Sequence, residues 1–350
     1  MKILIATSIY PPEIGRPSDY VRELPKYLSL KHTVNIVAYT NSQKPVPGAT
    51  LISVSKKSSR IYRLLKYFLA MLKASRDTEV IYVQNAMAAG LPVILIGFLR
   101  KMPVIINFFG DEGKNALMFL IQKFVLQRAA IIIAQSKQIK NHLINTYKIN
   151  QKKIALLYLP AENADILPFD VKREPFKILV CANKIEEKQA ENISKIFTKI
   201  KEKYPQATMV VIEEVNHTDK IKTEYDNLKF LGKVSKAEMW WLLQNSEVVL
   251  IYSLMENKPY TALKSFMAET ALICINTCSA CEIVENEKTG LVVKNENHSS
   301  VAEAVIKIFG DETLKNYLTT ESKKFLKEEF SWEKHVQSLH AIFESIVSPS

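Results

Sequence analysis

The stretch KILIAT (Lys2–Thr7) opens the chain with a short apolar, β-branched run, and KILVCA (Lys177–Ala182) opens the second half in the same way. Each run is followed by a segment with apolar residues at helical spacing, Asp19–Leu30 in the first half and Glu191–Lys203 in the second. Alternation of strands and helices is typical of parallel sheets with helices on both faces. The sequence therefore predicts an α/β fold of two Rossmann-like, doubly wound parallel-sheet domains facing a cleft.

The same alternation continues through both halves. The remaining expected strands are Val34–Ala38, Val80–Val83, Val104–Phe108, Ile131–Ala134, Thr208–Glu213, Val248–Tyr252, Leu272–Ile275 and Leu291–Val293. The remaining expected helices are Arg60–Ala74, Leu91–Arg100, Ala116–Arg128, Lys137–Tyr147, Lys236–Gln244, Ala262–Glu269 and Val301–Phe309. In such folds we expect ligands to bind outside the carboxyl ends of the strands.

The two halves meet in a segment rich in proline. A chain of 350 residues is long enough for two hydrophobic cores. Leu159–Pro175 contains Pro160, Pro168 and Pro175, and such a segment is typical of a linker. The predicted domains are therefore residues 1–170 and residues 171–330.

Composition and missing motifs exclude several classes of protein. A hydrophobic content of 47% excludes a wholly disordered chain. No G-x-G-x-x-G follows a predicted strand and no G-x-x-x-x-G-K-[ST] occurs, which argues against a nicotinamide enzyme and a P-loop ATPase. No nucleic-acid-binding motif is present, so no nucleic acid partner is expected.

The cysteines and histidines give no metal site by spacing. Four cysteines are too few for a disulfide scaffold, and they indicate a reducing, cytoplasmic location. Cys278 and Cys281 form a C-x-x-C pair, but no second pair has zinc-like spacing. We therefore expect thiols in a loop or in the core and no metal. The six histidines are expected at the surface or at its boundary.

The positive charge is concentrated in the first half. Residues 1–170 carry a net charge of +13 and residues 171–350 carry −2, which together give the total of +11. The stretch Ser55–Arg76 has no acid, and its apolar residues at helical spacing are flanked by the cations Lys56, Lys57, Arg60, Arg63 and Lys66. Two interpretations stay open: a helix that contacts an anionic membrane surface, or a core-facing helix with solvated cations. The uncharged run Val80–Leu99 is interrupted by polar residues, Gly90 and Pro92, so no membrane-spanning helix is expected.

Three loops at predicted strand ends contain groups that bind anions or sugar hydroxyls. Backbone amides at a helix start and lysine side chains suit phosphate, whereas a carboxylate accepts hydrogen bonds from sugar hydroxyls. The candidate residues in these loops are Gly15, Arg16, Lys184, Lys188, Glu256 and the amides of Tyr260, Thr261 and Ala262.

Taken in order, five stretches resemble a glycosyltransferase of the GT-B fold, in the retaining, nucleotide-sugar-dependent family four (glycosyl transferases group 1). PPEIG (residues 11–15) resembles the P-P-x-x-G-G loop of that family. IIIAQS (131–136) resembles its "v-i-a-v-S" strand, and LKFLGKV (228–234) its "v-x-f-l-G-x-v" segment. The other two are EIV with TGLVV (282–284, 289–293) and FSWE (330–333), which resembles the start of a terminal helix. The resemblance implies that residues 331–350 form a helix that packs back on the first domain.

The resemblance also implies roles for particular residues. Lys188 matches a lysine that holds the donor diphosphate, and Asn183 stands at the position of the companion arginine, with Lys184 next to it. Glu256 matches the glutamate that contacts the donor sugar. The implied catalytic residues are Glu256, Lys184 and Lys188, and the implied donor-binding residues are Gly15, Arg16, Asn183, Lys184, Lys188, Phe230, Gly232, Val234, Glu256, Tyr260, Thr261, Ala262 and Lys264. Gly110 and Asp111 are assigned to the acceptor side.

Several positions depart from the family pattern. Lys264 replaces a second glutamate that binds ribose, Phe109 replaces a histidine, and Arg16 replaces a glycine. A lysine donates hydrogen bonds but cannot accept them from ribose hydroxyls, and a phenylalanine transfers no proton.

The sequence therefore predicts a transferase that moves a sugar from a nucleoside diphosphate-sugar to an acceptor, with retention and without a metal or other cofactor. The basic first domain points to a lipid-linked acceptor at a membrane surface, with the protein cytoplasmic and peripheral on its inner face. The alternative is a GT-B shell that has lost catalysis and acts as a binding or scaffold partner. An epimerase of the same fold needs carboxylates and histidines in the cleft that the sequence does not locate.

Overall fold

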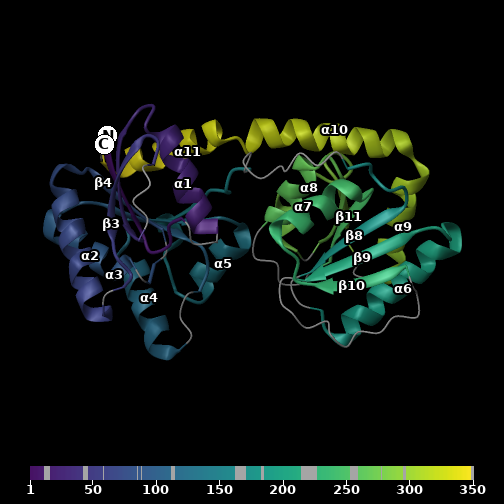
Figure 1. Ribbon diagram of the computed structural model, residues 1–350, viewed down its shortest axis with the longest axis horizontal. Helices are drawn as coiled ribbons and strands as arrows, with labels where there is room; N and C mark the ends of the chain where they lie inside the picture. Colours follow the sequence, from purple (N-terminus) through teal and green to yellow (C-terminus); the bar gives the residue numbers. More distant parts are fainter. Residues whose placement is uncertain are drawn as a thin grey trace. The chain divides into compact units, whose positions relative to one another are not determined.

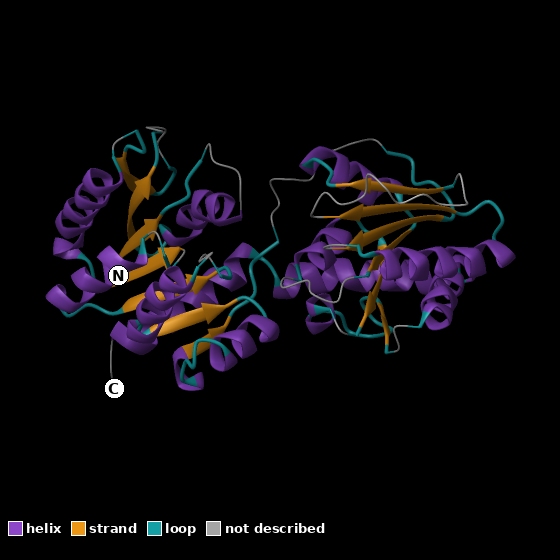
Figure 2. Cartoon of the chain, turned by 90° about the horizontal axis from the view of Figure 1, so that it is seen from below, coloured by secondary structure: helices purple, strands orange, loops and turns teal. Residues whose placement is uncertain are grey.

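The fold is known from a computed structural model that divides into two compact units. Unit 1 comprises Met1–Leu159 with Trp332–Ser350, and unit 2 comprises Pro160–Ser331. The structure describes residues 1–11, 16–41, 46–57, 59–84, 86–87, 89–111, 115–161, 171–182, 185–213, 227–252, 259–276, 278–294 and 297–347. Each unit contains one parallel sheet with helices on both faces (Figures 1 and 2).

Unit 1 contains a seven-stranded sheet in the order β3-β2-β1-β4-β5-β6-β7. Its strands are β1 (Lys2–Thr7), β2 (Thr33–Tyr39), β3 (Ala49–Val54), β4 (Val80–Gln84), β5 (Val104–Phe108), β6 (Ile131–Ala134) and β7 (Ile154–Leu156). Its helices are α1 (Arg16–Leu28), α2 (Arg60–Ala74), α3 (Gly90–Arg100), α4 (Ala116–Arg128), α5 (Lys137–Asn145) and α11 (Trp332–Val347), with short 3₁₀ turns at Ser75–Asp77 and Gln151–Lys153.

Side chains that alternate along the strands of unit 1 pack into two separate hydrophobic cores, one on each face of the sheet. Leu4 and Ala6 of β1 belong to the core on one face of the sheet, whereas Ile3 and Ile5 belong to the core on the other face. Both faces of a parallel sheet are covered, which is why its strands read as continuous apolar runs. Trp332 of α11 stacks on Tyr20 and Tyr27 of α1, with ring centroids 5.6 and 5.2 Å apart.

Unit 2 contains a six-stranded parallel sheet in the order β10-β9-β8-β11-β12-β13. Its strands are β8 (Lys177–Ala182), β9 (Thr208–Glu213), β10 (Leu228–Gly232), β11 (Val248–Ile251), β12 (Ala271–Ile275) and β13 (Leu291–Val293). Its helices are α6 (Glu187–Lys203), α7 (Lys236–Asn245), α8 (Tyr260–Met267), α9 (His298–Gly310) and α10 (Glu312–Glu329), with a 3₁₀ turn at Ser279–Glu282.

The predicted fold class is confirmed, since both units are Rossmann-like parallel sheets. The sequence missed β3, β7, β10 and α10 as elements. β7 has three residues, and β3 has a half-exposed pattern at the edge of its sheet. α10 buries Leu318 and Ser322 only, so it carries almost no apolar stripe.

Two histidines contradict the expectation that all six lie at the surface or at its boundary. His32, just before β2, is 9% exposed, and His335 of α11 is 5% exposed. Its Nε2 accepts a hydrogen bond from the Tyr20 hydroxyl at 2.7 Å, and its Nδ1 donates to the carbonyl of Tyr158 at 3.0 Å. Burial lowers the pKa of His335 to about 4, because the charged imidazolium would lose its hydration there.

Candidate functional site

Each sheet has a point at which the strand order reverses, and the loops there part to opposite sides. In unit 2 this point lies between β8 and β11, because the chain continues from β8 to β9 on one side and from β11 to β12 on the other. In unit 1 it lies between β1 and β4. Crevices at such points are where doubly wound sheets bind ligands. The loops singled out by the sequence follow β1, β8 and β11.

Part of the predicted site lies outside the described residues. This holds for Gly15, Asn183, Lys184 and Glu256, and for the side chains of Arg16 and Arg60. Lys188 is described, and its exposed side chain leaves the first turn of α6 directly after β8. A helix N-terminus attracts anions, whereas a lysine there is unfavourable by itself. An anion bound at this position would interact favourably with both the helix dipole and the Lys188 side chain.

The loop after β11 leads into α8, which begins at Tyr260. Thr261 is half-buried and Ala262 is buried in the first turn of this helix. The Nζ of Lys264 lies 4.5 Å from the centroid of the Tyr260 ring and 6.0 Å from that of Trp240. Aromatic faces attract a cation, so the lysine at the position of the missing glutamate is held by these two rings.

Three predicted donor-binding residues belong to β10 and its end. Phe230 is half-buried, and Val234 is half-buried just before α7. Gly232 has φ +66°, a left-handed conformation that favours glycine, and the ladder between β9 and β10 is irregular at this point. The glycine thus lets the chain turn from the strand toward α7. β10 is the edge strand of the sheet, two strands from β8.

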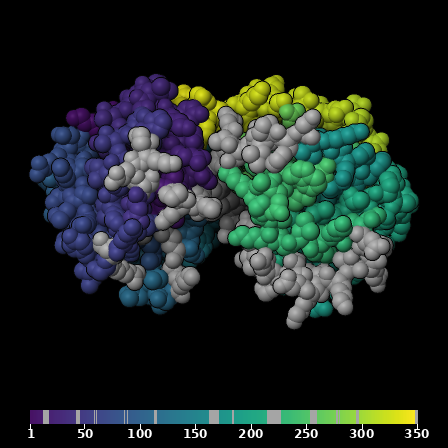
Figure 3. Space-filling model, viewed as in Figure 1, coloured from purple at the N-terminus to yellow at the C-terminus, as the bar shows by residue number. Residues whose placement is uncertain are grey.

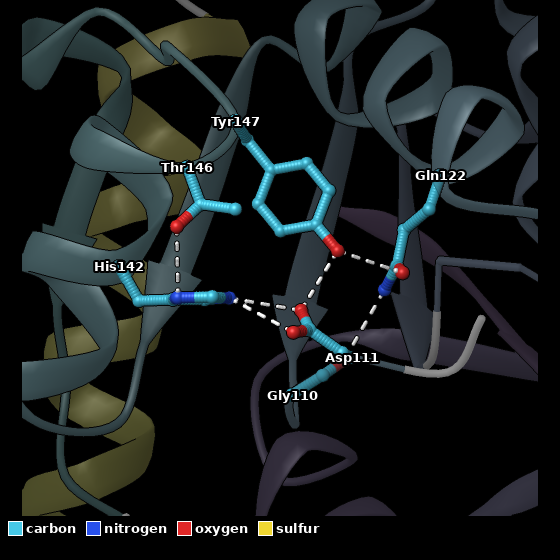
Figure 4. Close-up of polar contacts among 6 residues, drawn as sticks. All are labelled: Gly110, Asp111, Gln122, His142, Thr146 and Tyr147. Atoms are coloured by element: carbon cyan, nitrogen blue, oxygen red, sulfur yellow. Dashed lines mark hydrogen bonds and ion pairs between the residues drawn. The ribbon is translucent and has the colours of Figure 1, made fainter. Parts of the chain in front are cut away.

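A polar network lies beyond the end of β5, around Gly110 and Asp111 (Figure 4). Gly110 has φ +127°, which a residue with a side chain rarely adopts. The carboxylate of Asp111 accepts from His142 Nε2 at 2.9 Å and from the Tyr147 hydroxyl at 2.7 Å. The Nε2 of Gln122 donates to the carbonyl of Gly110 at 3.2 Å. The glycine turn therefore aims the carboxylate at α5 and the residues after it.

The sequence missed His142 and Tyr147 as partners of Asp111. His142 belongs to α5, and its Nδ1 lies 3.1 Å from the Thr146 hydroxyl (Figure 4). The Asp111 carboxylate is half exposed, so it can also meet a solute. An acid and an imidazole in contact can orient a sugar hydroxyl and take part in its proton transfer. The network stands next to Phe109, the position where the family pattern has a histidine.

The predicted membrane-contact residues lie on and before α2. Lys57 and Lys66 are exposed, Lys56 is half-buried, and Arg63 turns inward, with its guanidinium 5.8 Å from the centroid of the Tyr39 ring. The side chains of Tyr67 and Met71 make the buried face of α2. Ile61, Leu64, Leu65 and Leu69 are between 43% and 82% exposed, so the core interpretation is wrong for these residues.

The exposed apolar residues continue onto α3 and α4, and α3 packs between α2 and α4. We call the outer faces of these three helices the apolar surface of α2, α3 and α4. Its members are Ile61, Leu64, Leu65 and Leu69, with Leu91, Leu95, Phe98 and Leu99, and with Leu117, Leu120 and Phe124. The three helices contain seven Lys or Arg residues and no Asp or Glu. The three helices lie together in unit 1 (Figures 1 and 3).

None of the helices in the described ranges combines the length and apolar character needed to cross a bilayer.

Comparison with known proteins identifies the family. The model of Glycosyl transferases group 1 matches residues 162–325, and that of Glycosyltransferase Family 4 matches residues 18–161. The chain belongs to the glycosyltransferases. Among the curated relatives of this glycosyltransferase, the uncharacterized glycosyltransferase MJ1069 of Methanocaldococcus jannaschii is 22% identical over 99% of each chain.

Solved structures share the fold of this glycosyltransferase over its whole length. A glycosyltransferase from Rickettsia africae has a TM-score of 0.73 at 14% identity, with 100% of each chain covered. Alr3699/HepE of Anabaena, solved in complex with UDP, has a TM-score of 0.69 at 13% identity and covers 99% of this chain and 100% of its own. These likenesses show the GT-B fold.

Proposed function

We propose that the glycosyltransferase transfers a sugar from a nucleoside diphosphate-sugar to an acceptor, with retention of the anomeric configuration. The observation that carries the proposal is the reversal of strand order between β8 and β11. Lys188 at the start of α6 and the first turn of α8 both stand at that edge of the sheet. The relative solved with UDP supports a nucleotide donor for the same fold.

Negative charge develops on the departing diphosphate in such a reaction. Positive side chains and helix N-termini that are already in place stabilise this charge without reorganisation. We assign this role to Lys184 and Lys188 with the amides of Tyr260, Thr261 and Ala262. We also assign Asn183 and Glu256 to the binding of the donor phosphates and sugar, and Gly15 and Arg16 to donor binding.

The nucleoside is assigned to the segment from β10 to α7. Phe230 and Val234 offer half-buried apolar surface to a base, and Gly232 keeps the backbone close. Lys264 takes the place of a ribose-binding glutamate. The rings of Tyr260 and Trp240 fix the position of its ammonium group. From this position we assign the ammonium group a hydrogen bond to a ribose or phosphate oxygen.

The acceptor is assigned to unit 1, at Gly110 and Asp111. The Asp111–His142 pair orients the attacking hydroxyl, which approaches from the side of the leaving group, and its proton passes to the departing phosphate. Replacing Asp111 by asparagine is expected to lower kcat/KM for the acceptor about ten- to a hundredfold, because a hydrogen bond to a charged group is lost. Steady-state kinetics measure this effect, and donor affinity stays unchanged.

The exposed Asp77→Asn variant controls for the loss of one negative charge from unit 1. Equal acceptor kinetics for Asp111→Asn and Asp77→Asn would remove Asp111 from the acceptor site.

The apolar surface of α2, α3 and α4 supports a lipid-linked acceptor. Apolar side chains surrounded by cations insert into the headgroup region of an anionic bilayer, to which each cation adds attraction. Exposed apolar patches rimmed by polar residues mark interaction sites. We assign this surface to an anionic membrane, with the protein cytoplasmic and peripheral on the inner face.

The donor site is tested by reversing one charge in α6. Lys188→Glu is expected to weaken the binding of nucleoside diphosphates about ten- to a hundredfold, because it removes a charged hydrogen bond to phosphate. Isothermal titration calorimetry with UDP, GDP and ADP measures the affinity. Lys195→Glu is the matched control, since Lys195 is exposed on the same helix two turns further on. Equal affinities for the two variants would refute the assignment.

A further inference from the structure

Three of the four cysteines gather at the carboxyl end of β12. Cys274 is the last but one residue of that strand and is fully buried. Cys278 precedes the 3₁₀ turn Ser279–Glu282, is 4% exposed, and has Cys281 three residues further along. All three sulfur atoms lie within 4.8 Å of one another. The C-x-x-C pair of the sequence thus gains a third thiol from the strand.

The sulfur atoms are closer than separate thiols normally are. Sγ of Cys281 lies 2.8 Å from Sγ of Cys274 and 3.8 Å from Sγ of Cys278. Carbon atoms in contact stay about 3.5–4.0 Å apart, and sulfur is larger than carbon. Three sulfur atoms gathered this closely suit either an S–S bond between two of them or one cation shared by all three. An S–S bond uses two of the three thiols, whereas a cation uses all of them.

Backbone N–H groups surround the sulfur of Cys278. The N–H groups of Cys281 and Ala280 form hydrogen bonds with it. Amide groups that point at the first sulfur of a C-x-x-C turn supply the outer contacts that orient a metal ligand. A thiolate is the form in which cysteine binds a metal.

We propose that Cys274, Cys278 and Cys281 bind one Zn²⁺ ion as thiolates, with three protons released to solvent. Two thiolates on one tetrahedral zinc, with Zn–S bonds of about 2.3 Å, lie about 3.8 Å apart, which is the separation of Cys278 and Cys281. Cys274 reaches this separation by a shift of about 1 Å. A [4Fe–4S] cluster places each thiolate on a different iron and needs wider spacing.

A fourth ligand would complete the coordination of the zinc. Cys281 is the one partly exposed member of the three, so a water or a solute thiol can supply this ligand. Cys274 is paired in register with Ile251, the last residue of β11. The zinc would therefore fix the chain after β12 next to the strand that leads into the loop 253–258. The proposal does not depend on the donor or acceptor of the transfer reaction.

The test is zinc binding by the full-length, reduced protein and its cysteine variants. We expect about one equivalent of Zn²⁺ per chain, measured by competition with a chromophoric chelator and by metal analysis after gel filtration. Cys278→Ser and Cys281→Ser should each bind about a hundredfold more weakly or worse, because a lost ligand costs more than a lost outer contact. Cys181→Ser is the matched control. Cys181 is also buried and is paired with Ile251 from the other side, outside the cluster.

A second measurement uses the unaltered protein, so the test does not depend on the folding of a variant. Zn²⁺ should slow the alkylation of Cys281 by iodoacetamide, and Co²⁺ should give a thiolate-to-cobalt charge-transfer band that Cys278→Ser lacks. The proposal is overturned if the reduced protein binds no Zn²⁺, or if all three serine variants bind it equally. It is also overturned if the intact mass shows a disulfide that excludes zinc and that reduction converts to thiols with no zinc uptake.

Discussion

Replacing Ile61, Phe98 and Leu117 together by glutamate is expected to release the protein from vesicles that contain anionic lipid. These are the most exposed apolar residues of α2, α3 and α4, at 82%, 80% and 67%. Burial of one such side chain contributes about 1.5–3 kcal/mol, so the loss of three lowers the partition coefficient about a thousandfold or more. Co-sedimentation with vesicles of phosphatidylglycerol and phosphatidylcholine measures the effect. The fold should tolerate the change, because these side chains are in contact with solvent.

A matched pair of single variants separates insertion from a general change of charge. Phe98 and Leu30 are 80% and 78% exposed, but Leu30 lies after α1 and outside the apolar surface of α2, α3 and α4. Phe98→Glu should weaken vesicle binding, whereas Leu30→Glu should leave it nearly unchanged. Raised salt should also release the unaltered protein, because the cations around the apolar surface are screened. If the protein stays in solution with anionic vesicles at low ionic strength, the membrane assignment fails.

Acidification is expected to destabilise unit 1 through His335. The folded protein holds this imidazole neutral, with a pKa of about 4 against 6.5 for an unperturbed histidine. Below pH 6.5 the imidazole of His335 is protonated in the unfolded chain but stays neutral in the folded protein. The unfolding free energy therefore falls as the pH falls. The loss amounts to about 3 kcal/mol when the pH reaches 4, and it levels off below that pH.

Urea titrations between pH 7.5 and pH 4 measure this loss as a difference between the unaltered protein and His335→Gln. The variant loses the hydrogen bond from Tyr20 at every pH, which gives a constant offset, and it should lack the pH-dependent part. NMR of the ring should show a neutral imidazole at pH 5. A ring that is protonated at pH 5 in the folded protein, or parallel pH profiles for the two proteins, would contradict the assignment.

The sheets were predictable because their central strands are buried on both faces. β1, β5, β6, β8 and β9 have the bounds expected from the sequence, since each is a short apolar run between turn residues, and so does the edge strand β13. Edge strands carry a weaker signal. β3 is half exposed and is hydrogen-bonded to its neighbour β2. The sequence pattern of β3 alone does not reveal this pairing. α10 is polar over most of its surface, so its apolar stripe is too weak to predict a helix.

The site was less predictable, because its contacts join residues far apart in the chain. Asp111 meets His142 and Tyr147, which follow it by 31 and 36 residues. The strand order brings the ends of β5 and β6 together, and Gly110 turns the chain between them. Likewise, Cys274 looks like an ordinary core residue until the turn after β12 places two further sulfur atoms beside it. The spacing of the cysteines in the sequence indicated only the C-x-x-C pair.

Transfer itself is the most direct test of the account. The protein is incubated with UDP-, GDP-, ADP- and dTDP-sugars, with and without lipid-linked acceptors in anionic vesicles, and NMR follows the release of nucleoside diphosphate and the anomer formed. We predict that one donor is consumed, slowly by water and faster with an acceptor, and that the new bond keeps the anomeric configuration of the donor. Binding of no nucleotide, or binding without release of sugar from any donor, would contradict the account and leave a GT-B scaffold in its place.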